Sequence, residues 1–264
     1  MLEIRNVTKV FNKGTIDEKV ALNGLSLTLN DGDFVTVIGG NGAGKSTMLN
    51  AICGTWLPDS GSIILDDIDV TGLPEHKRAK YLGRVYQDPM MGTAANMWIE
   101  ENLALAARRG KRRTLRPMIT KSERESYRQL LAELNLGLES RLTTKVGTLS
   151  GGQRQALTLL MATLQSPKLL LLDEHTAALD PKTAARVMEL TEKIVNETKL
   201  TTLMITHNMR DAIQYGNRLI MLHDGRVILD ISGEEKQKLT VAELLEMFSK
   251  ASGNEFSDDR AILA

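Results

Sequence analysis

The stretch FVTVIGGNGAGKST, residues 34–47, decides the fold of this chain. It opens with apolar and β-branched residues, which predict a buried strand that runs straight into Gly39. The segment Gly39–Ser46 then matches the pattern G-x-x-x-x-G-K-[ST]. Glycines let a backbone wrap around a phosphate, and the helix expected from Lys45 adds the positive end of its dipole. We therefore predict a strand, a phosphate-binding loop and a helix. This order argues against a glycine-rich turn that matches by chance.

The side chains of this loop favour a nucleoside triphosphate as the ligand. Lys45 is long enough to reach the β and γ phosphates, and Ser46 offers a hydroxyl group to Mg²⁺. The loop residues that we expect to bind ATP are Gly39, Gly40, Asn41, Gly42, Ala43, Gly44, Lys45, Ser46 and Thr47.

A second strand ends in two acids. The segment LLLLDE, residues 169–174, predicts a buried strand followed by Asp173 and Glu174. In a parallel sheet such an end lies beside the phosphate loop. Asp173 suits Mg²⁺, directly or through water, and Glu174 is placed to polarise an attacking water. The alternative is a pair of acids that cap the next helix.

The pentapeptide LSGGQ, residues 149–153, narrows the class further. Here the chain resembles the ATP-binding cassette (ABC) ATPases, which carry this signature at this position. A helix that opens at Ser150 with the amides of two glycines can hold a phosphate. The first loop already holds the phosphates of its own nucleotide, so the resemblance implies that this second segment faces the nucleotide of another subunit. The residues concerned are Ser150, Gly151, Gly152 and Gln153.

Further positions agree with the family pattern, over roughly residues 1–250. The resemblance implies that Gln87 contacts Mg²⁺ and water and that His207 contacts the γ-phosphate. It also implies that Ala177–Asp180 is a dimer-contact loop and that Phe11 stacks on adenine. Taken singly, these residues have plainer interpretations: a turn residue, a packed histidine and a core aromatic. Their joint order and spacing favour the family.

Two features fall outside the pattern. His175 stands where the family usually has proline, and we expect a structural role at this strand-to-loop junction; a second titratable group near the γ-phosphate stays open. A basic run is expected to be a solvated loop, or else to contact a membrane partner or anionic headgroups. Its residues are Arg108, Arg109, Lys111, Arg112, Arg113 and Arg116. Nucleic acid is not an expected partner, because the run lacks aromatics and the 33 acidic and 33 basic residues balance.

We predict an α/β fold: a P-loop NTPase of ABC type, with a mixed sheet core, N-terminal antiparallel strands and an inserted helical subdomain. We expect one ATPase domain over residues 1–251, with the helical subdomain at about 88–165 and a C-terminal tail at 252–264. Further expected elements are strands 2–11, 20–29, 62–65 and 83–87, helices 121–136, 208–216 and 240–250, and a hairpin over 218–232 with its turn at Asp224-Gly225.

The composition is ordinary for a soluble domain, with 42% hydrophobic and 25% charged residues. No apolar run approaches the roughly 18–20 residues that span a bilayer. If the chain acts at a membrane, we expect it to do so peripherally. The single cysteine, Cys53, lies among apolar residues and is expected to be buried. This usage suits a reducing cytoplasm.

These observations predict an ATP-binding and ATP-hydrolysing subunit that powers a membrane transporter and imports a small solute such as an amino acid. The expected partners are a second ATPase subunit, as a homodimer, a permease on a separate chain and a solute-binding protein, at the cytoplasmic face of the cell membrane. ATP and Mg²⁺ are the expected cofactors. The alternatives are an exporter ATPase, a non-transport ABC ATPase of the iron–sulfur or DNA type, and a module that binds ATP without turnover. Glu174 and His207 argue against the last, and the ordinary helical segment between 47 and 149 argues against the DNA type.

Overall fold

The computed structural model describes residues 1–111 and 117–251. The predictions for Arg112, Arg113, Arg116 and the tail 252–264 lie outside these residues. The chain divides into two compact units, one formed by Met1–Arg78 with Thr198–Ala264 and the other by Ala79–Glu197. None of the helices in these two ranges combines the length and the apolar composition that a membrane-spanning helix needs.

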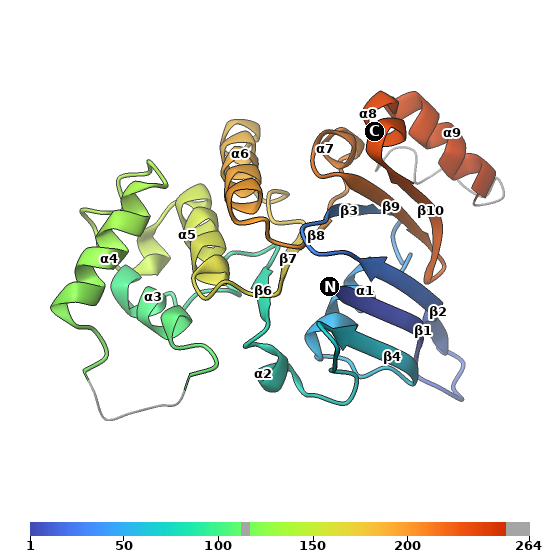
Figure 1. Ribbon diagram of the computed structural model, residues 1–264, viewed down its shortest axis with the longest axis horizontal. Coiled ribbons are helices and arrows are strands. Elements are labelled where there is room, and N and C mark those ends of the chain that lie inside the picture. The colour runs from blue at the N-terminus through green and yellow to red at the C-terminus, as the bar shows by residue number, and fades with distance from the viewer. Residues whose placement is uncertain (112–116, 252–264) are drawn as a thin grey trace. The chain divides into compact units, whose positions relative to one another are not determined.

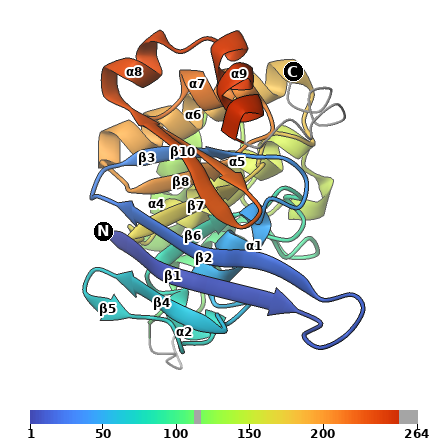
Figure 2. The same cartoon turned by 90° about the vertical axis from the view of Figure 1, so that its right-hand side faces the viewer.

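The first unit contains an antiparallel sheet in the order β2-β1-β4-β5. Its strands are β1 (Leu2–Phe11), β2 (Lys19–Leu29), β4 (Ser60–Leu65) and β5 (Ile68–Asp69). Leu2 pairs with Leu29 on one side and with Leu65 on the other, and all three are buried. Alternating apolar residues thus place one face of this sheet in the core. Figure 2 shows β1 between β2 and β4.

The same unit contains a second group of strands, in which β3 (Phe34–Ile38) lies between two parallel neighbours. These neighbours are β8 (Thr202–Ile205) and β9 (Arg218–His223), and β10 (Arg226–Ser232) pairs antiparallel with β9. All residues of β3 are buried, which explains why its sequence is apolar apart from Thr36.

The first unit also contains helices, several of which lie along one side of these strands (Figure 1). They are α1 (Lys45–Cys53), α2 (Glu75–Arg78), α7 (Met209–Gln214), α8 (Gly233–Lys238) and α9 (Val241–Ala251). Ile38 and Met221 share a hydrophobic cluster with Phe248 of α9. Cys53 is buried at the end of α1, as predicted.

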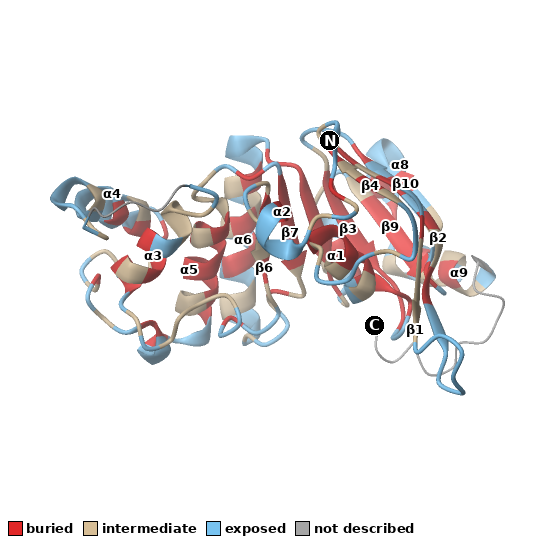
Figure 3. Cartoon of the chain, turned by 90° about the horizontal axis from the view of Figure 1, so that it is seen from below, coloured by how far each residue is buried: buried red, intermediate tan, exposed pale blue. Residues whose placement is uncertain are grey.

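The second unit combines a parallel strand pair with helices. Strands β6 (Leu82–Val85) and β7 (Leu169–Asp173) run side by side. The helices are α3 (Ile99–Ala107), α4 (Lys121–Ala132), the 3-10 turn η1 (Val146–Thr148), α5 (Gly151–Thr163) and α6 (Pro181–Thr198). Apolar side chains from α3, α4 and α5 form one cluster that includes Leu103, Leu131 and Leu157. Figure 3 shows the buried length of α5 and β7.

Two helices end earlier than predicted. Helix α4 stops at Ala132 instead of 136, because Asn135 and Gly137 adopt left-handed backbone angles, with φ of 53° and 69°. Leu134 is still buried but lies beyond the helix. Helix α7 ends at Gln214, because Tyr215 is extended and Gly216 has a φ of 74°.

Candidate functional site

The phosphate loop of the first unit connects β3 to α1, and its glycines are required by close packing. At Gly39, a Cβ atom would lie 2.3 Å from the carbonyl oxygen of Leu222. At Gly44, where φ is 100°, a Cβ atom would lie 2.6 Å from the carbonyl oxygen of Ala21. Real Cβ atoms do not approach so closely, so only glycine lets the loop follow this path.

Lys45 is buried within this loop, with 6% of its surface exposed. Its Nζ donates hydrogen bonds to the carbonyl oxygens of Gly39, at 2.6 Å, and Gly40, at 3.0 Å. Ala43 donates its backbone N–H to the carbonyl of Gly40. The carbonyl oxygens of Gly39 and Gly40 therefore lie against the Lys45 ammonium group within the loop.

The predicted hairpin turn supports the loop from outside. Gly225, in the turn between β9 and β10, donates its N–H to the carbonyl oxygen of Ala43 at 3.0 Å. Lys19, at the start of β2, also approaches the loop: a Cβ atom at Gly42 would lie 3.2 Å from its Nζ. The sequence gives no signal for the contacts of Gly225 or Lys19, because both residues are distant along the chain.

His207 follows β8 in the same unit and is held in a turn. The N–H of Asn208 donates to the hydroxyl of Thr206 at 3.0 Å, and the side chain of Asn208 accepts from Arg210 and Asp211 to cap α7. His207 is thus placed between a strand end and a capped helix.

Phe11 ends β1 and packs edge-on against Trp56, with ring centroids 5.2 Å apart. The Nζ of Lys9 lies 5.7 Å from the Phe11 ring. Phe11 remains partly exposed, and Trp56 is 42% exposed. An aromatic pair is therefore available to a planar ligand, and the role of Phe11 stays a prediction.

Asp173 and Glu174 lie at the end of β7 in the second unit, as expected. The carboxylate of Asp173 pairs with the guanidinium of Arg84 on β6 at 3.2 Å. Glu174 has a left-handed backbone, with φ of 46°. Such angles are unfavourable for residues with side chains and often mark functional positions.

The signature segment begins helix α5 in the same unit. The hydroxyl of Ser150 accepts from the N–H of Gln153 at 3.3 Å, and the side-chain oxygen of Gln153 accepts from the N–H of Ser150 at 3.2 Å. This reciprocal pair is a capping box, which fixes the start of the helix.

The glycines of the signature pack closely against α6 and the loop before it. A Cβ atom at Gly152 would lie 2.1 Å from the Cγ2 of Thr183, and one at Gly151 would lie 3.2 Å from Leu179. The predicted dimer-contact loop thus lies against the signature within one chain.

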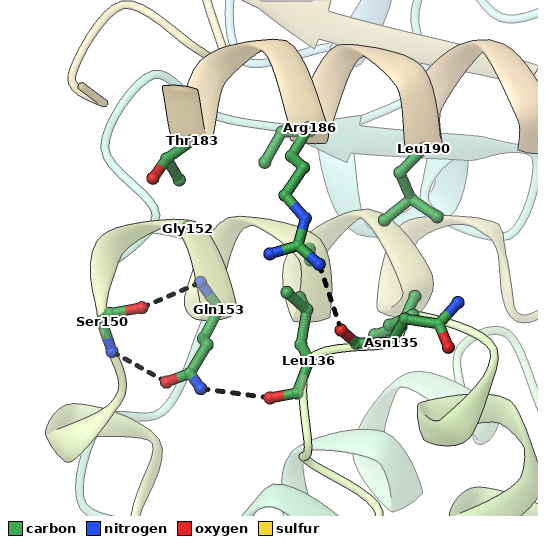
Figure 4. A pocket seen from close by; sticks show the side chains of 11 residues that line it. Asn135, Leu136, Ser150, Gly152, Gln153, Thr183, Arg186 and Leu190 are labelled. Carbon is green, nitrogen blue, oxygen red and sulfur yellow. Dashed lines mark hydrogen bonds between the residues drawn. The ribbon is translucent and has the colours of Figure 1, made fainter. Parts of the chain in front are cut away.

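A pocket of about 360 Å³ opens beside the signature, between α5 and α6 (Figure 4). Gln153 donates from its Nε2 to the carbonyl of Leu136 at one wall, and the guanidinium of Arg186 reaches toward Asn135 at 3.5 Å. The pocket adjoins Ser150, so it belongs to the surroundings of the signature.

Gln87 is exposed just beyond β6. The fully buried Gln155 of α5 donates to the carbonyl of Tyr86 at 3.1 Å and holds this segment. Arg154 donates to the carbonyls of Val146, Gly147 and Leu149 and so clamps the chain before the signature. Sequence reasoning missed Gln155 and Arg154; their positions within the signature helix were the only available signal.

The fold and these features define the class: a P-loop ATPase with a second helix start, rich in serine and glycine, at Ser150. The family model described as "ABC transporter" matches residues 22–177. A "Tyrosine transport ATP-binding protein" of Clostridioides difficile is 49% identical over 251 residues, covering 95% of this chain and 100% of that protein. The "Spermidine/putrescine import ATP-binding protein PotA" of Haemophilus influenzae is 33% identical, covering 89% of this chain and 59% of the relative.

A solved structure is also similar: the dimeric, post-hydrolysis state of the ATP-binding cassette MJ0796 bound to ADP and Pi. It has a TM-score of 0.75 and 30% identity, and the match covers 88% of this chain and 98% of that one. The chain belongs to the ABC transporter family. It is an ATP-binding and ATP-hydrolysing subunit of the kind found in that family. This confirms the predicted fold class and the ATPase activity.

Proposed function

We propose that two copies of this chain hydrolyse ATP between them and power the import of an amino acid through a separate permease. The signature helix carries this proposal. A capped helix start such as the one at Ser150 is suited to bind a phosphate, and the Lys45 loop of the same chain would bind the phosphates of its own nucleotide. Each chain thus offers two segments that could bind phosphate. Both segments are used if each ATP lies between the Lys45 loop of one copy and the signature of another.

In the proposed mechanism, the ammonium of Lys45 and the loop N–H groups offset the charge of the β and γ phosphates. The carboxylate of Glu174 orients the attacking water and accepts its proton. His207 donates a hydrogen bond to the γ-phosphate, and Ser150, Gly151 and Gly152 of the partner copy bind it from the other side.

The residues present suit Mg²⁺. Ser46, Gln87 and Asp173 offer hydroxyl, amide and carboxylate oxygens, the hard ligands that Mg²⁺ prefers. Among the described residues, no group of three or more His, Cys, Asp or Glu side chains could form a metal site. A shared site with few carboxylates and nucleotide phosphates is typical of Mg²⁺. The ion would neutralise phosphate charge when bound.

Glu174→Gln tests the assignment of the catalytic carboxylate. The amide keeps the shape of the side chain but cannot accept a proton, so we expect an ATP-bound dimer in size-exclusion chromatography and at least about 100-fold slower hydrolysis. Glu189→Gln on the exposed face of α6 is the matched control and should behave as wild type. Wild-type turnover in Glu174→Gln would contradict the assignment.

The transported solute is proposed from the relatives. The 49% identical relative is named for tyrosine transport, and the 33% identical relative is an import protein. We therefore propose import of tyrosine or a related amino acid, with a permease and a solute-binding protein as partners and the chain held at the cytoplasmic face of the membrane. Cells that carry Lys45→Ala should lose uptake of labelled tyrosine; unchanged uptake would exclude this cargo.

A further inference from the structure

His175 directly follows Glu174 and is buried, with 2% of its surface exposed. Its Nε2 lies 3.1 Å from the Oγ1 of Thr191, in the middle of α6. Thr191 is fully buried. A hydrogen bond between two such residues joins the end of β7 to α6, inside one compact unit.

The direction of this hydrogen bond follows from a second one. The hydroxyl of Thr191 lies 2.8 Å from the carbonyl oxygen of Val187, which can only accept. The single hydroxyl proton is therefore donated to Val187. Oγ1 must then accept from His175, so the proton of the neutral ring is on Nε2. Burial lowers the pKa of His175 to about 4, which keeps the ring neutral at neutral pH.

The bond acts beside an unusual backbone. Glu174 has φ of 46°, a left-handed conformation that persists only where its surroundings hold it. Its carbonyl oxygen accepts from the N–H of Ala177 at 3.0 Å. The hydrogen bond from His175 to Thr191 provides a second constraint, on the residue that follows Glu174.

We propose that His175 is a positioning residue: its hydrogen bond to Thr191 fixes the backbone of Glu174 against α6 and so aims the carboxylate. The inference rests on the proposed catalytic role of Glu174. Helix α6 also carries Thr183, which packs against Gly152 of the signature. The same helix thus supports the carboxylate and the signature segment.

Thr191→Val tests the proposal with little change in volume. Valine buries well but cannot accept the Nε2 proton. We expect the single-turnover rate of ATP hydrolysis to fall by about 10-fold or more, since small displacements of a catalytic group are costly. ATP affinity should stay within about two-fold, because the Lys45 loop is unchanged. Thr191→Ser keeps the hydroxyl and should restore most of the rate.

A matched control separates the loss of the hydrogen bond from His175 from the loss of the intrahelical hydrogen bond between Thr191 and Val187. The hydroxyl of Thr163, on α5, donates to the carbonyl of Leu159 at 3.0 Å and has no histidine partner among the described residues. Thr163→Val removes a similar intrahelical bond. It should therefore leave hydrolysis unchanged.

A mutant cycle shows whether Thr191 acts through Glu174. If it does, Thr191→Val should slow the wild type but not the residual hydrolysis of Glu174→Gln. Equal slowing in both backgrounds would indicate a general structural effect and overturn the proposal.

Two further outcomes would also overturn it, and they separate the inference from the proposed function. Normal hydrolysis by Thr191→Val, with Glu174→Gln inactive, would reject the positioning role alone. Normal hydrolysis by Glu174→Gln would reject the catalytic role of Glu174 and the inference together. Nitrogen-15 spectra of the four histidines provide a direct readout: His175 should show a protonated Nε2, and a protonated Nδ1 would contradict the proposal.

Discussion

The ammonium group of Lys45 is held by carbonyl oxygens of its own loop, those of Gly39 and Gly40. These hydrogen bonds restrict the Lys45 side chain, so it loses little further conformational entropy when it binds a phosphate. Removing it leaves the glycine loop without its cation.

We expect Lys45→Ala to weaken ATP binding by about 10- to 100-fold, as expected for the loss of hydrogen bonds to a charged group. Isothermal titration with ATP measures the change. Lys13→Ala, at an exposed position in the loop after β1, is the control and should bind as wild type. Equal affinity in Lys45→Ala would remove the argument for the phosphate loop.

His175 also predicts how stability depends on pH. Burial lowers its pKa from 6.5 to about 4 in the folded chain, so below pH 6.5 the unfolded chain binds the extra proton more readily. The contribution of neutral His175 to the free energy of unfolding is complete above about pH 6.5. It is lost as the pH falls, by about 2–3 kcal/mol near pH 4.5. Urea unfolding of wild type and His175→Gln over this range measures the difference. Parallel curves for the two proteins would contradict the prediction.

The sequence could predict the location of residues that belong to continuous motifs. Lys45, Asp173 and the signature serine lie in continuous motifs, where strand, loop and helix signals adjoin. Arg84 meets Asp173 across 89 residues of sequence, and Thr191 meets His175 across 16. The local sequence around these four residues does not indicate the two contacts, because both contacts depend on how β6, β7 and α6 pack.

The contact between α5 and α6 depends on the absence of a side chain at Gly152. Long apolar runs and glycine or proline punctuation predicted most elements, including the hairpin at Asp224-Gly225. Two helix ends were missed, because α4 stops four residues early, at Ala132, and α7 stops at Gln214. The left-handed turns that follow these helices are not detected by periodicity. The short α8 was not predicted, because it has too few residues for a periodic signal.

Gly152→Ala would place a Cβ atom 2.1 Å from the Cγ2 of Thr183. We expect a loss of about 1–3 kcal/mol in the free energy of unfolding, because the overpacked helices must separate. Thr183→Ser removes the clashing methyl group, so the double variant should recover most of the loss. A double variant as unstable as Gly152→Ala would show that this contact is not the cause. Chemical denaturation of the three variants provides the comparison.

The features assigned to ATP are divided between the two units. The first unit holds the Lys45 loop and His207, and the second holds Asp173, Glu174 and the signature. The family resemblance predicted that the signature serves a second copy, and the dimeric relative bound to ADP and Pi supports a paired arrangement. No single-chain motif can show this, because the partner surface is formed only by the pair.

In the proposed dimer, each ATP is hydrolysed between the Lys45 loop of one copy and the signature of the other. A mixed dimer tests this arrangement: two inactive variants, Lys45→Ala and Ser150→Phe, carry different affinity tags and are purified together. One site of this dimer carries both lesions and the other carries none, so the ATPase rate should recover to about half of the wild-type value. A mixed dimer no more active than either variant alone would contradict this arrangement.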